Sequence, residues 1–146
     1  MKVKDCMCND VCYCLPDTTI SDCAKLMSSK HIGYVPVCDT NQRLVGVVTD
    51  RDIALRCIAC EKDSKTTKVS DIMSSNIFSC TPEDEMKTIE NKMSENQIRR
   101  LPIVDGNKVV GIISIGDLAR NEQINSECVG NTLENICCGK NNKNAD

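Results

Sequence analysis

The sequence predicts an α+β fold made of two copies of one unit, each running strand, helix, strand, strand, helix. The first observation is an internal repeat. Laid against itself, the chain aligns Val35-Pro36-Val37 with Leu101-Pro102-Ile103 and Gly46-Val47-Val48-Thr49 with Gly111-Ile112-Ile113-Ser114. The second is the spacing of apolar residues, which switches within each copy between helical periodicity and short continuous runs. The third is that both copies place turn residues at the same points.

Capping residues and one apolar face predict the first helix of each unit. Asp17 and Thr18 are predicted to cap a helix, and its counterpart begins near Glu83. Acidic residues in a first turn suit the helix dipole. The apolar side carries Ile20, Cys23, Ala24 and Met27 in the first copy and Met86, Ile89 and Met93 in the second.

Two strands and a second helix complete each unit. In the first copy the strands are Tyr34 to Cys38 and Leu44 to Val48, joined by a polar turn. In the second copy the turn is Asp105-Gly106-Asn107, a stronger hairpin signal. A second helix is expected to start near Asp50 or Gly116.

These elements divide the chain into four parts. Residues 1–60 form the first repeat, 61–68 a polar linker, and 69–122 the second repeat. Residues 123–146 are rich in Asn and Lys and are expected to be a loose tail. Since one such repeat is too small to bury its apolar face alone, two repeats should pack as a pseudo-twofold pair with two equivalent clefts.

Composition excludes several functional classes. The formal net charge of −3 and aromatic content of 2% give no basic, aromatic surface for nucleic acid. No apolar stretch is long enough for a membrane helix, and the N-terminus lacks an apolar signal core, so a cytoplasmic location is expected. The 12 cysteines are then expected to be reduced thiols.

The sharpest chemical feature occurs twice. In each copy a buried strand ends in a hydroxyl residue, Thr49 or Ser114, and a carboxylate follows three residues later, Asp52 or Asp117. This is the capping-box spacing, which explains it without any ligand. A helix N-terminus also suits a phosphate, and a carboxylate can accept from two ribose hydroxyls. Because the pattern is duplicated, we favour a ligand site over capping alone.

On these residues the sequence resembles the CBS-domain family, specifically a stand-alone tandem pair or Bateman module. The resemblance covers about residues 1 to 120. It rests on the openings Asp5-Cys6-Met7 and Asp71-Ile72-Met73, the two apolar-Pro-apolar strands, and the two glycine-led segments that end in Asp52 and Asp117.

The resemblance implies a regulatory module rather than an enzyme. Such pairs bind AMP, ADP, ATP or S-adenosylmethionine in clefts between repeats, often as homodimers that build a flat disc of four repeats. No cofactor is required, and the output would pass to an effector protein that the sequence does not identify.

The resemblance also assigns roles to individual residues. Asp52 and Asp117 would bind ribose, and Thr49 and Ser114 would face phosphate. Arg99 and Arg100 would reach phosphate, with Arg100 favoured. The first repeat has Gly33 and Tyr34 at those positions, so its site should hold an anion less well. For the adenine, the resemblance implies Val11 at the Asp117 site and Ile77 at the Asp52 site.

Two other functions stay open. The first is a metal or redox sensor that uses cysteines, with the candidates Cys6, Cys8, Cys12, Cys14, Cys57, Cys60, Cys128, Cys137 and Cys138. Against it, Cys6, Cys12, Cys23 and Cys38 align with apolar residues of the second repeat, as small core hydrophobes would. The second is an interaction module with empty clefts. The sequence shows no catalytic triad and no glycine-rich phosphate loop.

Overall fold

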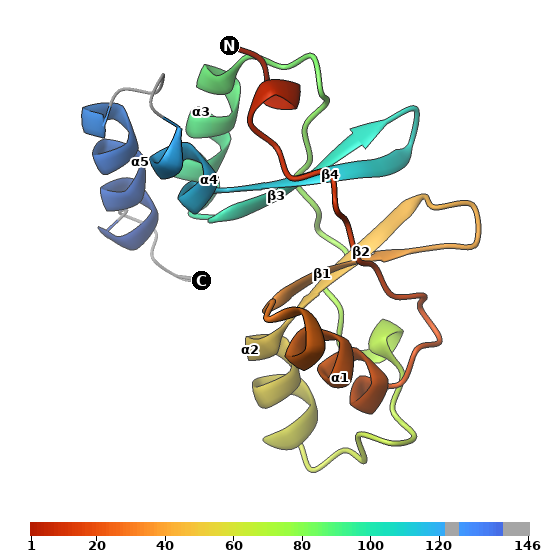
Figure 1. Cartoon of the computed structure of the whole chain (residues 1–146). Coiled ribbons are helices and arrows are strands. Elements are labelled where there is room, and N and C mark those ends of the chain that lie inside the picture. The colour runs from red at the N-terminus through yellow and green to blue at the C-terminus, as the bar shows by residue number, and fades with distance from the viewer. Residues whose placement is uncertain (122–125, 139–146) are drawn as a thin grey trace. The chain divides into compact units, whose positions relative to one another are not determined.

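The computed structural model describes residues 1–121 and 126–138 and confirms an α+β fold with two repeats (Figure 1). The chain forms two compact units. One contains Cys12–Ile77 and Asn107–Val109. The other contains Met1–Val11, Phe78–Gly106 and the described part of Val110–Asp146. Each unit therefore includes the opening segment of the other repeat.

The first repeat has the expected helix, strand, strand, helix order after its opening. Its elements are α1 (Ile20–Lys30), β1 (Tyr34–Cys38), β2 (Leu44–Thr49), α2 (Asp50–Asp52) and η2 (Ile53–Ile58), where η2 continues α2 as a π-helical turn. β1 and β2 pair antiparallel, with Tyr34 opposite Thr49 and Pro36 opposite Val47. The same unit receives η3 (Val69–Asp71), a short 3-10 turn from the opening of the second repeat.

The second repeat follows the same plan. Its elements are α3 (Met86–Asn96), β3 (Arg100–Asp105), β4 (Lys108–Ser114), α4 (Ile115–Arg120) and α5 (Ser126–Cys138), with η1 (Val3–Asp5) packed in the same unit. Gly106 and Asn107 have φ values of 56° and 72°. Positive φ at both central residues is the primed turn that a two-residue hairpin needs, as the Asp-Gly-Asn signal predicted.

The first helices begin later than the sequence indicated. Thr19 caps α1, its Oγ1 accepting from Asp22 N at 3.2 Å, whereas the sequence indicated Asp17 and Thr18. Thr18 instead holds the preceding turn, because its Oγ1 accepts from Leu15 N at 3.1 Å. α3 begins at Met86 rather than near Glu83.

The opening strands are also shorter than predicted. Over residues 1–11 the ladder is reduced to isolated bridges, with Cys8 opposite Ile112 and Lys2 opposite Glu85. Ser74 makes the matching bridge to Val47 in the other unit. The opening segments thus contribute isolated bridges instead of a regular ladder.

Each unit has its own apolar core, and cysteines contribute to both. Cys14, Cys23 and Cys57 lie in the core of the first repeat, and Cys80 lies in that of the second. Cys23 and Cys38 are fully buried, which agrees with their alignment to apolar residues. Aliphatic side chains fill the rest, led by Ile20, Val35, Val37, Val48 and Ile72 in one core and Ile89, Met93, Leu101, Ile103, Ile113 and Leu118 in the other.

The expectation of a loose tail is wrong for Ser126–Cys138, which form α5 against α3 and α4 (Figure 1). Val129, Thr132 and Ile136 are buried and recur at helical spacing on one side of α5. The many Asn residues concealed this stripe from a reading by composition. Residues 122–125 and 139–146 lie outside the described part.

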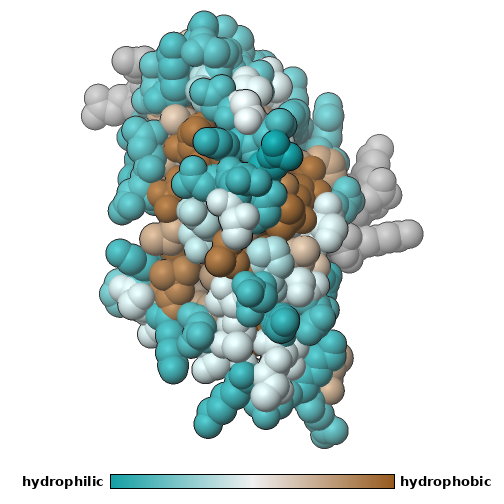
Figure 2. All heavy atoms as spheres, turned by 90° about the vertical axis from the view of Figure 1, so that its right-hand side faces the viewer, coloured by the Kyte–Doolittle hydropathy of each residue, from teal (hydrophilic) through white to brown (hydrophobic). Residues whose placement is uncertain are grey.

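Apolar side chains also reach the surface. On the face shown in Figure 2 they form separate patches among polar residues. Ile58 and Leu55, both on η2, are 67% and 49% exposed. Across residues 1–121 and 126–138, no helix has the length and apolarity to cross a membrane.

Candidate functional site

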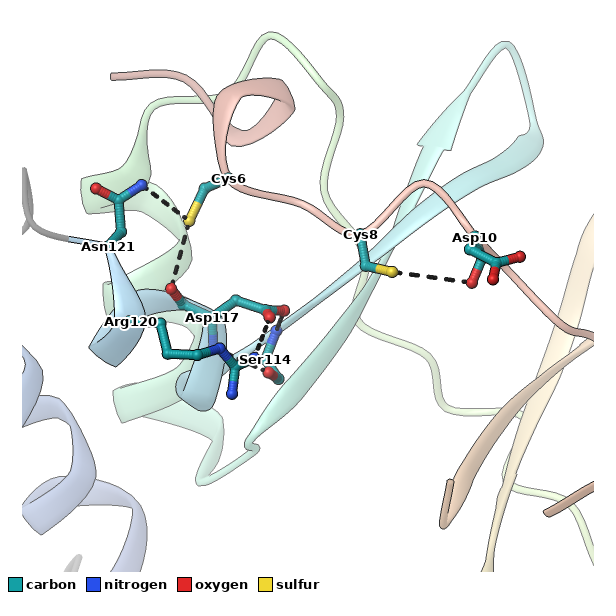
Figure 3. Close-up of polar contacts among 7 residues, drawn as sticks. All are labelled: Cys6, Cys8, Asp10, Ser114, Asp117, Arg120 and Asn121. Atoms are coloured by element: carbon teal, nitrogen blue, oxygen red, sulfur yellow. Dashed lines mark hydrogen bonds and ion pairs between the residues drawn. The ribbon is translucent and has the colours of Figure 1, made fainter. Parts of the chain in front are cut away.

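Ser114 and Asp117 meet at the junction of β4 and α4, where the strand turns directly into the helix (Figure 3). Ser114 Oγ accepts from Asp117 N at 3.1 Å, and Asp117 Oδ2 accepts from Ser114 N at 2.9 Å. This reciprocal pair is a complete capping box. The cap fixes both side chains at the end of the strand.

The other carboxylate oxygen of Asp117 binds Arg120. Arg120 Nη2 donates to Asp117 Oδ1 at 2.6 Å, and the side chain of Asp117 is 20% exposed. Cys6 contacts the backbone of Asp117, because its thiol donates to Asp117 O at 3.6 Å. Asn121 Nδ2 in turn donates to Cys6 Sγ at 3.6 Å (Figure 3). Burial raises the pKa of the Cys6 thiol, so it stays protonated at neutral pH.

Arg99 and Arg100 lie next to this junction. Ile115 N, at the start of α4, donates to Arg99 O at 2.9 Å, which holds the Arg99 backbone beside the helix start. Arg100 begins β3 and is half-buried, whereas Arg99 is exposed. Among the described residues, neither guanidinium forms an ion pair with a carboxylate, in contrast to Arg120. Both are therefore available to an external anion.

The first repeat reproduces the cap. Thr49 Oγ1 accepts from Asp52 N at 3.1 Å, and Asp52 Oδ2 accepts from Thr49 N at 2.9 Å. Asp52 Oδ1 lies 3.7 Å from Arg56 Nε, and the Asp52 side chain is 17% exposed. The two junctions thus share one geometry, and each pairs its carboxylate with an arginine of the following turn.

The first repeat differs where the second has Arg99. Gly33 takes that place, with Asp50 N donating to Gly33 O at 2.9 Å. A Cβ on Gly33 would lie 2.5 Å from Asp50 Oδ2, so no larger side chain fits without moving that carboxylate. Repeat 1 therefore has a carboxylate beside the glycine that aligns with Arg99.

Glycines allow the opening segments to lie against β2 and β4. A Cβ on Gly111 would lie 2.8 Å from Met7 Sδ, and one on Gly46 would lie 2.5 Å from Met73 Sδ. These segments bring Val11 into the unit that holds Asp117 and Ile77 into the unit that holds Asp52. Both side chains are half-buried. Their contact with an adenine stays a prediction.

The caps leave capacity for a ligand. Each hydroxyl accepts one hydrogen bond from an amide and keeps its own hydrogen to donate. Each carboxylate oxygen can accept more than one hydrogen bond. Capping and ligand binding are therefore compatible functions of the same four side chains, Thr49, Asp52, Ser114 and Asp117.

Sequence reasoning missed Arg56, Arg120 and Asp50. The two arginines had a usable signal. In each repeat an arginine follows the aspartate by about one turn of helix, Arg56 in the first repeat and Arg120 in the second. Asp50 had none, since its proximity to Gly33 depends on the antiparallel pairing of β1 and β2.

The cysteines whose side chains are described form no evident metal site. Within the described part of the chain, no three Cys, His, Asp or Glu side chains are grouped so that they could hold a metal ion. Cys8, Cys60 and Cys137 are exposed, and Cys6, Cys12 and Cys128 are partly buried. The Cys138 side chain lies outside the description.

The family model of the CBS domain matches residues 3–58 and 69–123. The chain belongs to the CBS domain family. The two matched segments contain both capped junctions, so each CBS repeat of the chain carries one of the two candidate sites.

One curated relative and two solved structures match this chain over most of their length. CBS domain-containing protein YhcV of Bacillus subtilis is 43% identical over 134 residues, which are 92% of this chain and 94% of YhcV. The CBS domain pair of protein MJ0100, solved with 5-methylthioadenosine and S-adenosyl-L-methionine, has a TM-score of 0.73 at 27% identity and covers 82% of this chain and 94% of its own. Hypoxic Response Protein I, solved with two coordinated zinc ions, has a TM-score of 0.75 at 29% identity and covers 82% of this chain and 98% of its own.

Proposed function

We propose that this CBS pair is a non-enzymatic cytoplasmic sensor of an adenosine nucleotide and that it signals through a partner protein. AMP, ADP, ATP and S-adenosylmethionine are the candidate ligands. The observation that carries the proposal is the duplicated cap, which presents a hydroxyl and a carboxylate together at each strand–helix junction. The ligands of the MJ0100 pair, both adenosine compounds, support the ligand class.

The Ser114–Asp117 junction is the stronger of the two sites in this proposal. The ribose hydroxyls would donate to Asp117, and the Ser114 hydroxyl would donate to a phosphate oxygen. Arg100, with Arg99, would neutralise the phosphate charge, because neither is engaged by a carboxylate among the described residues. Val11 would contact the adenine.

The Thr49–Asp52 junction would bind a phosphate less well. It has Gly33 in place of Arg99, and the Asp50 carboxylate lies against that glycine. Because like charges repel, an anionic ligand at this junction would lack the attraction of Arg99 and meet the repulsion of Asp50. Ile77 would contact the adenine at this site.

A thermal-shift panel on the reduced, metal-free full chain tests the proposal. The panel contains AMP, ADP, ATP, S-adenosylmethionine, NADH and zinc. A ligand that binds only the folded state at 100 times its Kd adds about 2.7 kcal/mol to the free energy of unfolding. We expect a clear rise with at least one adenosine compound. A rise with zinc alone, or with nothing, contradicts it.

We also propose that the protein acts as a homodimer through the helical face of the first repeat. Leu55 and Ile58 are exposed on this face, which borders an open hollow of about 490 Å³ between α1 and η2. The corresponding face of the second repeat is covered by α5. A second copy would thus meet the first repeat alone, in contrast to the disc of four repeats that the family resemblance implied.

Light scattering after gel filtration tests the dimer. Ile58→Lys should give a monomer, because it places a charge in the proposed interface. Leu133→Lys is the matched control, since Leu133 is 43% exposed on α5. A monomeric wild-type chain, or a dimer that survives Ile58→Lys, contradicts this interface.

A further inference from the structure

Arg120 occupies the carboxylate that the second junction would offer to a ribose. Its Nη2 donates to Asp117 Oδ1 at 2.6 Å, and the other carboxylate oxygen, Oδ2, accepts from Ser114 N at 2.9 Å. Both oxygens of Asp117 are therefore engaged in the free protein. A ribose hydroxyl that approaches Oδ1 must compete with a charge-assisted hydrogen bond.

The two partners of Asp117 differ in how easily they can move. The Ser114 amide belongs to the backbone at the end of β4 and is held by the capping box. The Arg120 side chain, by contrast, is 74% exposed. An exposed ion pair contributes little to stability, because water screens it and the long side chain loses rotamer freedom. Arg120 is therefore the partner that a ligand can displace at small cost.

The Arg120 guanidinium also lies beside the hydroxyl proposed to face phosphate. A Cβ on Gly116 would lie 3.4 Å from Arg120 Nη1 and 3.5 Å from Ser114 Oγ, so both groups border the same small space. Figure 3 shows Ser114, Asp117 and Arg120 gathered at the start of α4. The planar guanidinium matches phosphate geometry. A phosphate bonded to the Ser114 hydroxyl would thus be within reach of Arg120.

The first repeat lacks this movable arginine. The alignment that matches the two capped junctions places Leu55 at the position of Arg120. Arg56, whose Nε lies 3.7 Å from Asp52 Oδ1, also donates through Nη1 to Ile72 O at 3.0 Å. Because a backbone carbonyl holds Arg56, that arginine is not poised to follow a ligand.

We propose that Arg120 selects the ligand of the second junction by the charge of the ligand, an inference that rests on the nucleotide-sensing function proposed above. When a nucleotide binds, the ribose hydroxyls take Asp117 Oδ1 and the guanidinium moves to the phosphate. An adenosine compound without phosphate displaces Arg120 and offers it no new partner. Arg120 therefore favours phosphorylated nucleotides over a neutral nucleoside or the cationic S-adenosylmethionine.

Calorimetric titration with adenosine, AMP and ATP tests the proposal. The parent is the full chain carrying Asp52→Ala, so that the intact junction is the one in the second repeat. Arg120→Leu copies Leu55 of the first repeat and should fold. It should bind adenosine about 2- to 5-fold more tightly, because no exposed ion pair has to break. It should bind the preferred nucleotide roughly 10-fold less tightly, because a charged hydrogen bond to phosphate is lost.

Lys87→Ala in the same parent is the matched control. Lys87 is 71% exposed and pairs with Glu90 at 3.5 Å on α3, so the variant loses the same charge and a similar ion pair within the same unit. It should leave the affinities for adenosine and the nucleotide unchanged. If Arg120→Leu moves both affinities in the same direction, or behaves as Lys87→Ala does, Arg120 does not select the ligand.

The remaining outcomes separate this inference from the proposed function. Binding by wild type but not by a folded parent would place the nucleotide at the first repeat and overturn the inference alone. A wild-type chain that binds none of the three compounds also overturns it, and the thermal-shift panel then decides the proposed function independently. Arg120→Gln, which keeps a polar side chain without the charge, repeats the test if Arg120→Leu does not fold.

Discussion

Replacing Asp117 by alanine should weaken nucleotide binding far more than it weakens the fold. In the free protein the substitution removes two contacts, the hydrogen bond from Ser114 N at 2.9 Å and the ion pair with Arg120 at 2.6 Å. Loss of a cap costs about 1 kcal/mol, and an exposed ion pair contributes about 0.2–1 kcal/mol. For a chain of this size that corresponds to a fall in Tm of roughly 2–8 °C.

The effect on the ligand is larger because the ribose loses a charged acceptor. A hydrogen bond to a charged group contributes about 1.5–3 kcal/mol, which is roughly a 10- to 100-fold increase in Kd. Calorimetric titration with the adenosine compound that gives the largest thermal shift measures this directly. An affinity of Asp117→Ala within twofold of wild type would refute the assignment.

Asp71→Ala is the matched control. Asp71 makes the same carboxylate contact at the start of η3, with Oδ2 accepting from Lys68 N at 3.3 Å, but it lies outside the Ser114–Asp117 junction. It should lower Tm by a comparable amount and leave the affinity unchanged. If Asp71→Ala weakens binding as much as Asp117→Ala, the loss reflects the fold and not a ribose contact.

Three further perturbations test other parts of the structure. Asp52→Ala should weaken nucleotide binding less than Asp117→Ala in the same titration, and the reverse ranking would contradict the unequal sites. Hydrogen bonds and charge from Lys2 and Lys4 lower the pKa of Glu83 to about 2, so its contribution to stability is present above its ordinary pKa and is lost as pH falls through about 2. Glu83→Gln should therefore lower Tm at pH 7 and match wild type below pH ~2; a constant difference would exclude the ion pairs as the cause. Ile136→Ala, at a position 2% exposed, should cost about 2–5 kcal/mol in urea unfolding, and equal stability would show that α5 is not docked.

The sequence was sufficient for the repeat, the two hairpin strands of each unit and the capped junctions. Apolar runs and a polar turn located β1 to the residue, because a short buried strand between a helix and a turn has few alternative positions. The junctions were predictable because capping depends only on local spacing, and both boxes form with the residues expected.

The features that could not be predicted from the sequence depend on contacts between residues far apart in the chain. Nothing local indicates that Met1–Val11 joins the unit of the second repeat, because that choice depends on the close approach that Gly111 allows. The buried stripe of α5 depends on α3 and α4 as partners, so a polar composition concealed it. The sequence placed the cap of α1 too early, because Thr18 and Thr19 can both accept from nearby amides. Thr18 accepts from Leu15 N in the preceding turn, which leaves Thr19 to cap the helix.

The two repeats share the geometry of the capped junction but differ in the charged residues beside it. Both junctions hold a hydroxyl and a carboxylate in the same reciprocal cap, so either can present the acceptors that a ribose needs. Beside that common part, repeat 2 has arginines without a carboxylate partner among the described residues, whereas repeat 1 has the Asp50 carboxylate against Gly33. Duplication would give equal sites if the surroundings were equal. If the junctions bind the proposed ligands, we expect ligand charge to decide which site fills first: a phosphate should favour repeat 2, and a cationic ligand such as S-adenosylmethionine should meet less repulsion in repeat 1.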